Sequence, residues 1–229
     1  MKKIIALFLF LSAGSVLFAQ ATKASQDAGL WATLNVEKKL SDRFNVLFTE
    51  ECRLRDNYSR VNLFYTDIGL ETNVAKFLKV ALCYRNIQKS TDPGFYSFRH
   101  RFMLDITLKK KFGNFVLSYR QRIQREARNI YTSERGYLPE WYSRNKFGVK
   151  YDFGKRITPY VSAEFRYQLH DPRMMESDQT WHRARYVAGI DYELGKKSSL
   201  GLYYLMQHEW NVKTPQTIFI TGVEYNFKF

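Results

Sequence analysis

The stretch I-F-I-T-G-V-E-Y-N-F-K-F, residues 218–229, alternates almost strictly between two kinds of side chain. One set is apolar apart from Thr221, and it comprises Phe219, Val223, Tyr225, Phe227 and Phe229. The intervening set contains Ile220, Gly222, Glu224, Asn226 and Lys228. Because successive side chains of a β-strand point to opposite faces, a period of two predicts a strand with one apolar and one polar face.

The last residue of this stretch, Phe229, is aromatic. Such an ending resembles the terminal strand of bacterial outer-membrane β-barrels, which the barrel-assembly machinery recognises. The resemblance implies an outer-membrane protein that contacts this machinery through its last strand.

Ten earlier segments repeat the same alternation. Their apolar rows begin at Leu30, Phe44, Phe64, Leu78, Phe98, Phe115, Trp141, Ile157, Ala184 and Leu200. Bacterial single-chain barrels have an even number of strands. We therefore expect a short additional strand at Ala21 to Ala28 and about twelve strands, with ten as the alternative. The fold class predicted is all-β: a closed antiparallel transmembrane β-barrel.

The connections between these segments alternate in length. Short connections are expected at Leu40 to Arg43, Ala75 to Phe77, Lys111 to Asn114, Gly154 to Arg156 and Gly195 to Ser198. Longer ones are expected at Asp56 to Arg60, Ser90 to Ser97, Ala127 to Glu140, Asp171 to Thr180 and Asn211 to Gln216. This asymmetry is typical of outer-membrane barrels, which have short periplasmic turns and longer extracellular loops.

The first nineteen residues have the composition of a secretory signal peptide. Lys2 and Lys3 precede an apolar run from Ile4 to Leu11, and small residues follow as far as Ala19. The apolar run is shorter than the roughly 20 residues that span a bilayer as a helix. We expect residues 1–19 to be a cleaved Sec-type signal peptide and residues 20–229 to form one barrel domain in the outer membrane of a Gram-negative cell.

The overall composition agrees with a barrel. Aromatic residues make up 17% of the 229 residues, and the mean hydropathy of −0.42 is low, as expected when apolar and polar faces average out. The formal net charge is +14. No basic helix, zinc-ligand spacing or nucleic-acid motif accompanies it, which argues against a nucleic-acid partner. Arg125, Arg128 and Arg135 are instead expected to contact lipopolysaccharide phosphates beside the outer-membrane lipid.

The second face of the strands is rich in charge and is expected to face the barrel interior. The basic candidates are Arg99, Arg101, Arg120, Arg122, Arg144, Arg166, Arg183 and Arg185. The acidic candidates are Glu51, Asp67, Glu71, Asp105, Glu164, Asp191 and Glu193. Arginine pairs at i and i+2 share one face of a strand and suit carboxylate or anion binding.

Two functions follow from an arginine-rich interior. In the first, arginine–carboxylate pairs fill the interior and the barrel is structural. In the second, the arginines line a narrow channel for anions or small solutes. Interiors of eight-stranded barrels are filled by side chains, and those of barrels with about sixteen strands leave a channel. A strand number near twelve is therefore compatible with either function.

A lipid-acting outer-membrane enzyme, phospholipase- or acyltransferase-like, is the alternative from another class. It would need a serine beside one of the four histidines, His100, His170, His182 or His208. No serine has a suitable spacing, so we predict no catalytic residues and no enzyme activity. Cys52 and Cys83 are expected on opposite faces without a disulfide, and no metal or cofactor is expected.

Several motifs resemble the DUF2490 family. These are the W-x-x-x-x-x-x-K-K-L-S-D-R-F segment at Trp31 to Phe44, E-x-R-L-R at Glu51 to Arg55, R-H-R-F at Arg99 to Phe102, and the Y-N-F-K-F ending. The resemblance covers essentially the whole chain after the signal peptide. It implies an outer-membrane barrel of a kind common in Bacteroidota, with no biochemical function assigned to the family.

Overall fold

The computed structural model describes residues 25–92, 95–128 and 139–229. Predictions that fall on residues 1–24, including the signal peptide, lie outside this range. The described chain contains eleven strands and no helix. They are β1 (Ser25–Lys39), β2 (Phe44–Arg55), β3 (Arg60–Ala75), β4 (Leu78–Asp92), β5 (Phe95–Phe112), β6 (Phe115–Arg128), β7 (Glu140–Tyr151), β8 (Ile157–His170), β9 (Trp181–Glu193), β10 (Ser198–Glu209) and β11 (Gln216–Lys228).

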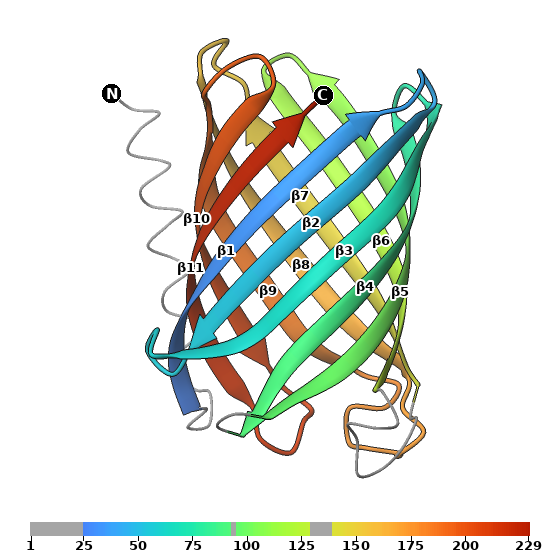
Figure 1. The fold of residues 1–229 in the computed structure, drawn as a ribbon, viewed down its shortest axis with the longest axis vertical. Coiled ribbons are helices and arrows are strands. Elements are labelled where there is room, and N and C mark those ends of the chain that lie inside the picture. Colours follow the sequence, from blue (N-terminus) through green and yellow to red (C-terminus); the bar gives the residue numbers. More distant parts are fainter. Residues whose placement is uncertain (1–24, 93–94, 129–138) are drawn as a thin grey trace.

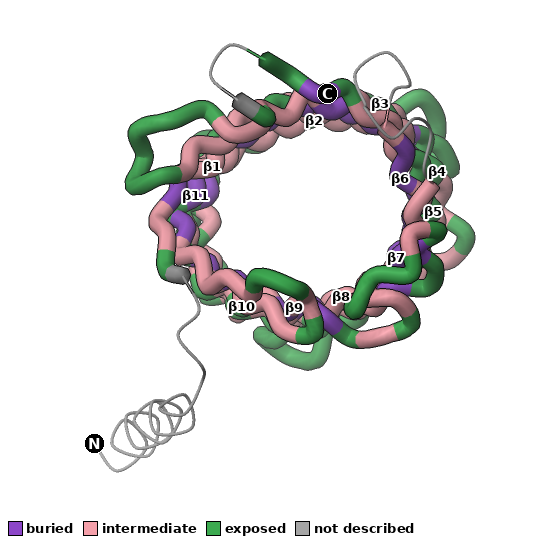
Figure 2. The backbone as a smooth tube through the Cα atoms, turned by 90° about the horizontal axis from the view of Figure 1, so that it is seen from below, coloured by how far each residue is buried: buried purple, intermediate pink, exposed green. Residues whose placement is uncertain are grey.

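The strands form a closed barrel in which each strand pairs with its neighbours in sequence, and β1 pairs with β11. In end view the backbone is a closed ring (Figure 2). All pairs are antiparallel except β1–β11, which is parallel from Ser25↔Gln216 to Glu37↔Lys228. In Figure 1 the arrows of β1 and β11 accordingly point to the same end.

The prediction of about twelve strands was wrong, as was its alternative of ten. Residues 25–28, expected to belong to a short separate strand, are the beginning of β1 itself. Each connection reverses the chain direction, so an odd number of strands makes the first and last run the same way. The parallel seam is therefore the geometric consequence of eleven strands.

The apolar rows point outward and the polar rows inward. Leu82 and Phe102, for example, are 64% and 50% exposed on the outer surface, whereas Asp67 and Arg85 are buried in the interior. A barrel in water would reverse this arrangement because apolar surface is stable only away from water. The alternation in the sequence therefore gives the barrel an apolar outside and a polar inside.

The two ends of the barrel differ in their connections. At the end where β1 finishes, the upper end in Figure 1, the turns include residues 76–77 and 113–114. At the opposite end, connections span residues 171–180 and 210–215. We call these the short-turn end and the long-loop end.

The loop predicted at Ser90 to Ser97 was wrong in extent, since β4 continues to Asp92 and β5 starts at Phe95. The turn at residues 56–59 is also short, so the asymmetry is weaker than predicted.

Candidate functional site

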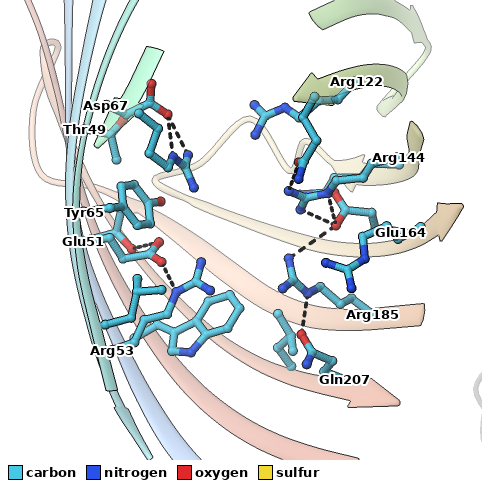
Figure 3. Close-up of a pocket in the computed structure, with 18 of the residues that line it drawn as sticks. Thr49, Glu51, Arg53, Tyr65, Asp67, Arg122, Arg144, Glu164, Arg185 and Gln207 are labelled. Carbon is cyan, nitrogen blue, oxygen red and sulfur yellow. Dashed lines mark hydrogen bonds and ion pairs between the residues drawn. The ribbon is translucent and has the colours of Figure 1, made fainter. Parts of the chain in front are cut away.

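The barrel encloses a cavity of about 770 Å³ to which all eleven strands contribute side chains. Figure 3 shows two groups of residues facing each other across this space. Thr49, Glu51, Arg53, Tyr65 and Asp67 lie on the β2–β3 side, and Arg122, Arg144, Glu164, Arg185 and Gln207 lie on the side of β6–β10. The dashed interactions in the figure run within each group, but the Arg185 guanidinium lies 5.2 Å from the centroid of the Trp31 ring on β1, so the two sides approach each other there.

The structure brings most of the sequence-predicted residues into the wall of this cavity. All eight basic candidates line it: Arg99, Arg101, Arg120, Arg122, Arg144, Arg166, Arg183 and Arg185. The acidic candidates that line it are Glu51, Asp67, Glu71, Asp105 and Glu164. Asp191 instead pairs with Lys150 at 2.5 Å near the short-turn end, and Glu193 is exposed at the end of β9.

Four charged lining residues were not predicted to face the interior. They are Arg55, Lys89, Glu126 and Glu140. The signal for Lys89 and Glu126 was present, because each continues the period of two up to the last residue before a predicted loop. Lys89 follows Arg85 and Ile87 on β4, and Glu126 follows Arg122 and Gln124 on β6.

Glu164 on β8 is the most connected carboxylate of the interior. Its oxygens accept hydrogen bonds from Arg120 Nη2 at 2.8 Å, Arg144 Nη2 at 2.5 Å and Arg185 Nη1 at 3.4 Å. Three guanidinium groups therefore share one negative charge. Because the cluster keeps a local surplus of positive charge, it would attract an additional anion.

Other arginine–carboxylate contacts are bidentate or shared. Arg122 donates to both oxygens of Asp105 at 2.6 Å. Glu126 accepts from Arg99 at 3.0 Å and from Arg101 at 2.5 Å. The planar guanidinium fork matches a carboxylate in this way, so these contacts hold the interior side chains in fixed positions.

Basic side chains outnumber acidic ones around the cavity. Among the described side chains that line it, thirteen are lysine or arginine and nine are aspartate or glutamate. Within the described chain, Lys89 and Lys146 have no carboxylate within ion-pair distance, and Arg166 donates to His182 Nε2 at 2.7 Å instead. The interior is therefore a polar, incompletely neutralised and net positive environment.

Aromatic side chains narrow the same space. The Arg53 guanidinium lies 3.6 Å from the centroid of the Trp31 ring, and that of Arg85 lies 3.6 Å from the Tyr65 ring. Such stacking supports a guanidinium against a ring face and limits its motion. The arginines on the β2–β4 side are therefore held by both rings and carboxylates.

The four histidines do not form a hydrolase-like arrangement. His100 Nδ1 contacts the Tyr84 hydroxyl at 2.7 Å, and His208 Nδ1 contacts Thr217 Oγ1 at 2.9 Å. In the described part of the chain no histidine hydrogen-bonds to a serine hydroxyl. The described part of the chain also contains no group of three or more histidine, cysteine or acidic side chains placed to hold a metal ion. Both cysteines carry free thiols.

The 171–180 connection is held against the barrel by charge. Arg173 bonds to Asp171 Oδ2 at 2.7 Å and also to Glu140 on β7. Burial raises the pKa of Asp171, but the hydrogen bonds from the side chain and backbone of Arg173 outweigh it and hold the pKa below its usual value. The Arg173 side chain, bonded to Asp171, has a raised pKa and stays charged.

The fold and the interior define a class of protein, the closed β-barrels with an apolar outer surface and a charged, hydrogen-bonded interior. Residues 28–217 match the family described as "Protein of unknown function (DUF2490)", and the chain belongs to this family. The family resemblance inferred from the sequence motifs is thereby confirmed. A search of curated proteins gives no match.

Two solved structures share the fold. The β domain of the Bordetella autotransporter Brka is 11% identical with a TM-score of 0.52, over 83% of this chain and 86% of that one. LpxR from Salmonella typhimurium is 10% identical with a TM-score of 0.54, over 85% of this chain and 87% of that one. At such low identity the likeness concerns the barrel fold alone.

In the described part of the chain, no helix is long and apolar enough to cross a membrane.

Proposed function

We propose that this chain is an outer-membrane β-barrel whose net positive interior forms a narrow passage for small anions. The observation that carries the proposal is the open cavity lined by more basic than acidic side chains. A purely structural interior would pair its charges fully, because an uncompensated buried charge is costly. The surplus is explained if mobile anions complete the neutralisation.

The outer surface supports a position within a bilayer. Leu104, Ile106 and Leu108 are exposed along β5, and comparable apolar rows cover the other strands. Exposed aromatic side chains lie near both strand ends, as in the interfacial girdles of membrane barrels: Phe77, Phe112, Phe153, Trp141 and Trp181. Short turns would then face the periplasm and long loops the cell exterior, with lipid and lipopolysaccharide around the barrel.

The experiment that tests the passage is single-channel recording of the refolded protein in a planar bilayer under a KCl gradient. We expect steps with a reversal potential that favours chloride. Arg120→Gln should lower this preference, since it removes one positive charge while Glu164 keeps Arg144 and Arg185 as partners. Lys111→Gln, which affects an exposed turn pair with Asp152, is the matched control and should leave selectivity unchanged.

Absence of conductance from a barrel shown to be folded would contradict the proposal and favour a structural role. Cation selectivity, or equal selectivity in the wild type and Arg120→Gln, would contradict the role assigned to the arginines.

A further inference from the structure

A cluster of basic side chains surrounds the interior near the long-loop end. We call Lys89, Arg99, Arg101 and Arg183 the mouth cluster; all four line the cavity. Lys89 lies three residues before the end of β4, Arg99 lies near the start of β5, and Arg183 is the third residue of β9. Strands β4 and β9 lie on opposite sides of the barrel. All four side chains nevertheless line the same cavity, so their charges face one enclosed space.

The carboxylates of this region neutralise only part of the cluster. Glu126 is shared by Arg99 and Arg101, at 3.0 and 2.5 Å. Glu209 pairs with Arg183, and no described carboxylate pairs with Lys89. The four positive charges of the mouth cluster therefore pair with two carboxylates, a difference of two charges, while Glu140 at the same end pairs with Arg173 of the 171–180 connection.

Hydrogen-bond donors in the same region also lack protein acceptors. The Nε–H groups of Arg99 and Arg183 are buried without a hydrogen-bond partner in the described chain. Buried polar groups are normally satisfied, so donors left over on two sides of one space indicate an acceptor that is not part of the chain. The unused guanidinium donors and the Lys89 ammonium require several acceptor atoms on one ligand.

We propose that the mouth cluster binds a soluble solute carrying phosphate-type oxyanion groups with a total charge of two or more. Guanidinium groups select oxyanions because their directional N–H donors match pairs of oxygen atoms, which a halide ion does not offer. The charge of such a ligand matches the local surplus of two. This site would determine which solutes the proposed passage accepts, so the inference rests on the proposed function. It places recognition of the solute at the long-loop end.

The test is calorimetric titration of the detergent-folded full-length barrel with sodium pyrophosphate, compared with sodium chloride at equal ionic strength. We expect one pyrophosphate to bind per barrel and chloride to give no saturable signal. Lys89→Gln should weaken binding by about tenfold or more, the loss of one charge-assisted contact. Lys89→Arg should retain binding. Lys150→Gln removes a lysine at the short-turn end, where it pairs with Asp191, and should bind as the wild type does.

Heat-dependent gel mobility verifies that each variant is folded, and Lys89→Gln breaks no ion pair. Absence of pyrophosphate binding, or equal weakening by Lys89→Gln and Lys150→Gln, overturns the site. If chloride currents persist in that case, the passage stands and only its substrate class is wrong. Pyrophosphate binding that depends on Lys89 in a barrel without conductance supports the site while the passage fails.

A second arm separates soluble phosphate from lipid phosphate. Vesicles containing lipopolysaccharide are added before the pyrophosphate titration. Unchanged pyrophosphate binding supports a soluble ligand, because a phosphate-bearing headgroup outside the barrel does not reach Lys89. Loss of pyrophosphate binding overturns the assignment to a soluble solute.

Discussion

At the scale of single residues, Glu164 determines how the interior charges are held. It is 8% exposed and accepts from three arginines that come from β6, β7 and β9. Arg185 lies directly opposite it in the register, whereas Arg120 reaches it across β7. One carboxylate therefore connects four neighbouring strands, and its charge prevents repulsion among three guanidinium groups.

The first prediction concerns this carboxylate. Glu164→Gln keeps the shape of the side chain but removes its charge, so the three arginines lose their counterion. Removing one partner of a buried ion pair typically costs about 3–5 kcal/mol. We expect the free energy of unfolding, measured by urea titration in detergent micelles, to fall by an amount of that order. Glu176→Gln, at an exposed loop position, is the control and should change it little. Equal stability of Glu164→Gln and wild type would contradict a structural role for this contact.

A second prediction concerns the pH dependence of the 171–180 connection. The pKa of Asp171 is lower in the folded protein than its reference value of 3.8. Its stabilising contribution is therefore complete above that value and is lost as the pH falls through the lower folded pKa. We expect hydrogen exchange of the Met174 amide, which donates to the Asp171 carbonyl at 3.0 Å, to be equally protected from pH 7 to about pH 4. Protection should decrease only below this, while amides in the middle of β8 remain protected.

Arg173→Gln provides the matching test at neutral pH. This variant removes the ion pairs to Asp171 and Glu140 and should decrease the Met174 protection at pH 7. Protection that is lost already near pH 6, or that survives Arg173→Gln, would show that this contact does not hold the connection.

The sequence predicted well which side chains face the interior, because alternate residues of a strand point to the same face. It did not predict which carboxylate each arginine chooses. The contact of Arg120 with Glu164 spans two strands and depends on side-chain length and barrel curvature, neither of which appears in a pattern of period two. Lys89 was missed because the following residues, Ser90 to Gly94, have the composition of a loop although Ser90, Thr91 and Asp92 continue β4.

At the scale of elements, the seam between β1 and β11 is where the prediction failed. The expectation of an even strand number came from antiparallel closure in bacterial barrels. The sequence showed that the first clear strand and the last run in the same direction, and a parallel seam satisfies this without an additional strand. Thirteen residue pairs from Ser25↔Gln216 to Glu37↔Lys228 form it. The alternation within β1 and β11 is compatible with either closure, so periodicity did not decide between them.

The third prediction concerns the packing of β11 against β10. The Tyr203 ring lies against Gly222, and a Cβ added at Gly222 would be 1.9 Å from it. Gly222→Ala must therefore displace this ring, and overpacking of this kind typically costs about 1–3 kcal/mol. We expect a lower urea midpoint for Gly222→Ala than for Gly201→Ala, where the nearest atom is 3.2 Å away. Equal midpoints would contradict close packing of Tyr203 on β11.

The fourth prediction concerns the end of β11. Phe229 bonds through its backbone to Lys39 and Glu37 at 2.9 and 3.0 Å, and its ring is half exposed. The ring therefore contributes little to closure. Phe229→Ala should refold in detergent with nearly unchanged stability, yet accumulate less in the outer membrane of cells, if the assembly machinery recognises this residue. Phe112→Ala, an exposed aromatic at the same end of the barrel, is the control. Normal membrane accumulation of Phe229→Ala would contradict the proposed partner.

At the scale of the whole molecule, charge is distributed unevenly between the surfaces. The chain carries a formal net charge of +14, but the described lining of the cavity accounts for a surplus of only four. Most of the formal charge therefore lies outside the described lining of the cavity. The composition thus shows that the protein is basic. The smaller surplus of positive charge in the interior can be counted only when the closed barrel shows which side chains line the cavity.

The last prediction follows from the small size of this interior surplus. An attraction of anions by four unneutralised charges is screened by salt, with a screening length of about 10 Å at 0.1 M and 3 Å at 1 M. We expect the chloride preference of the proposed channel to be strong at low salt and to weaken sharply as KCl is raised to 1 M, because the screening length then falls to about a third of its value at 0.1 M. A selectivity that is independent of salt would indicate a geometric filter instead. In that case the fixed pairs around Glu164 and Asp105, rather than the surplus charge, would control the passage.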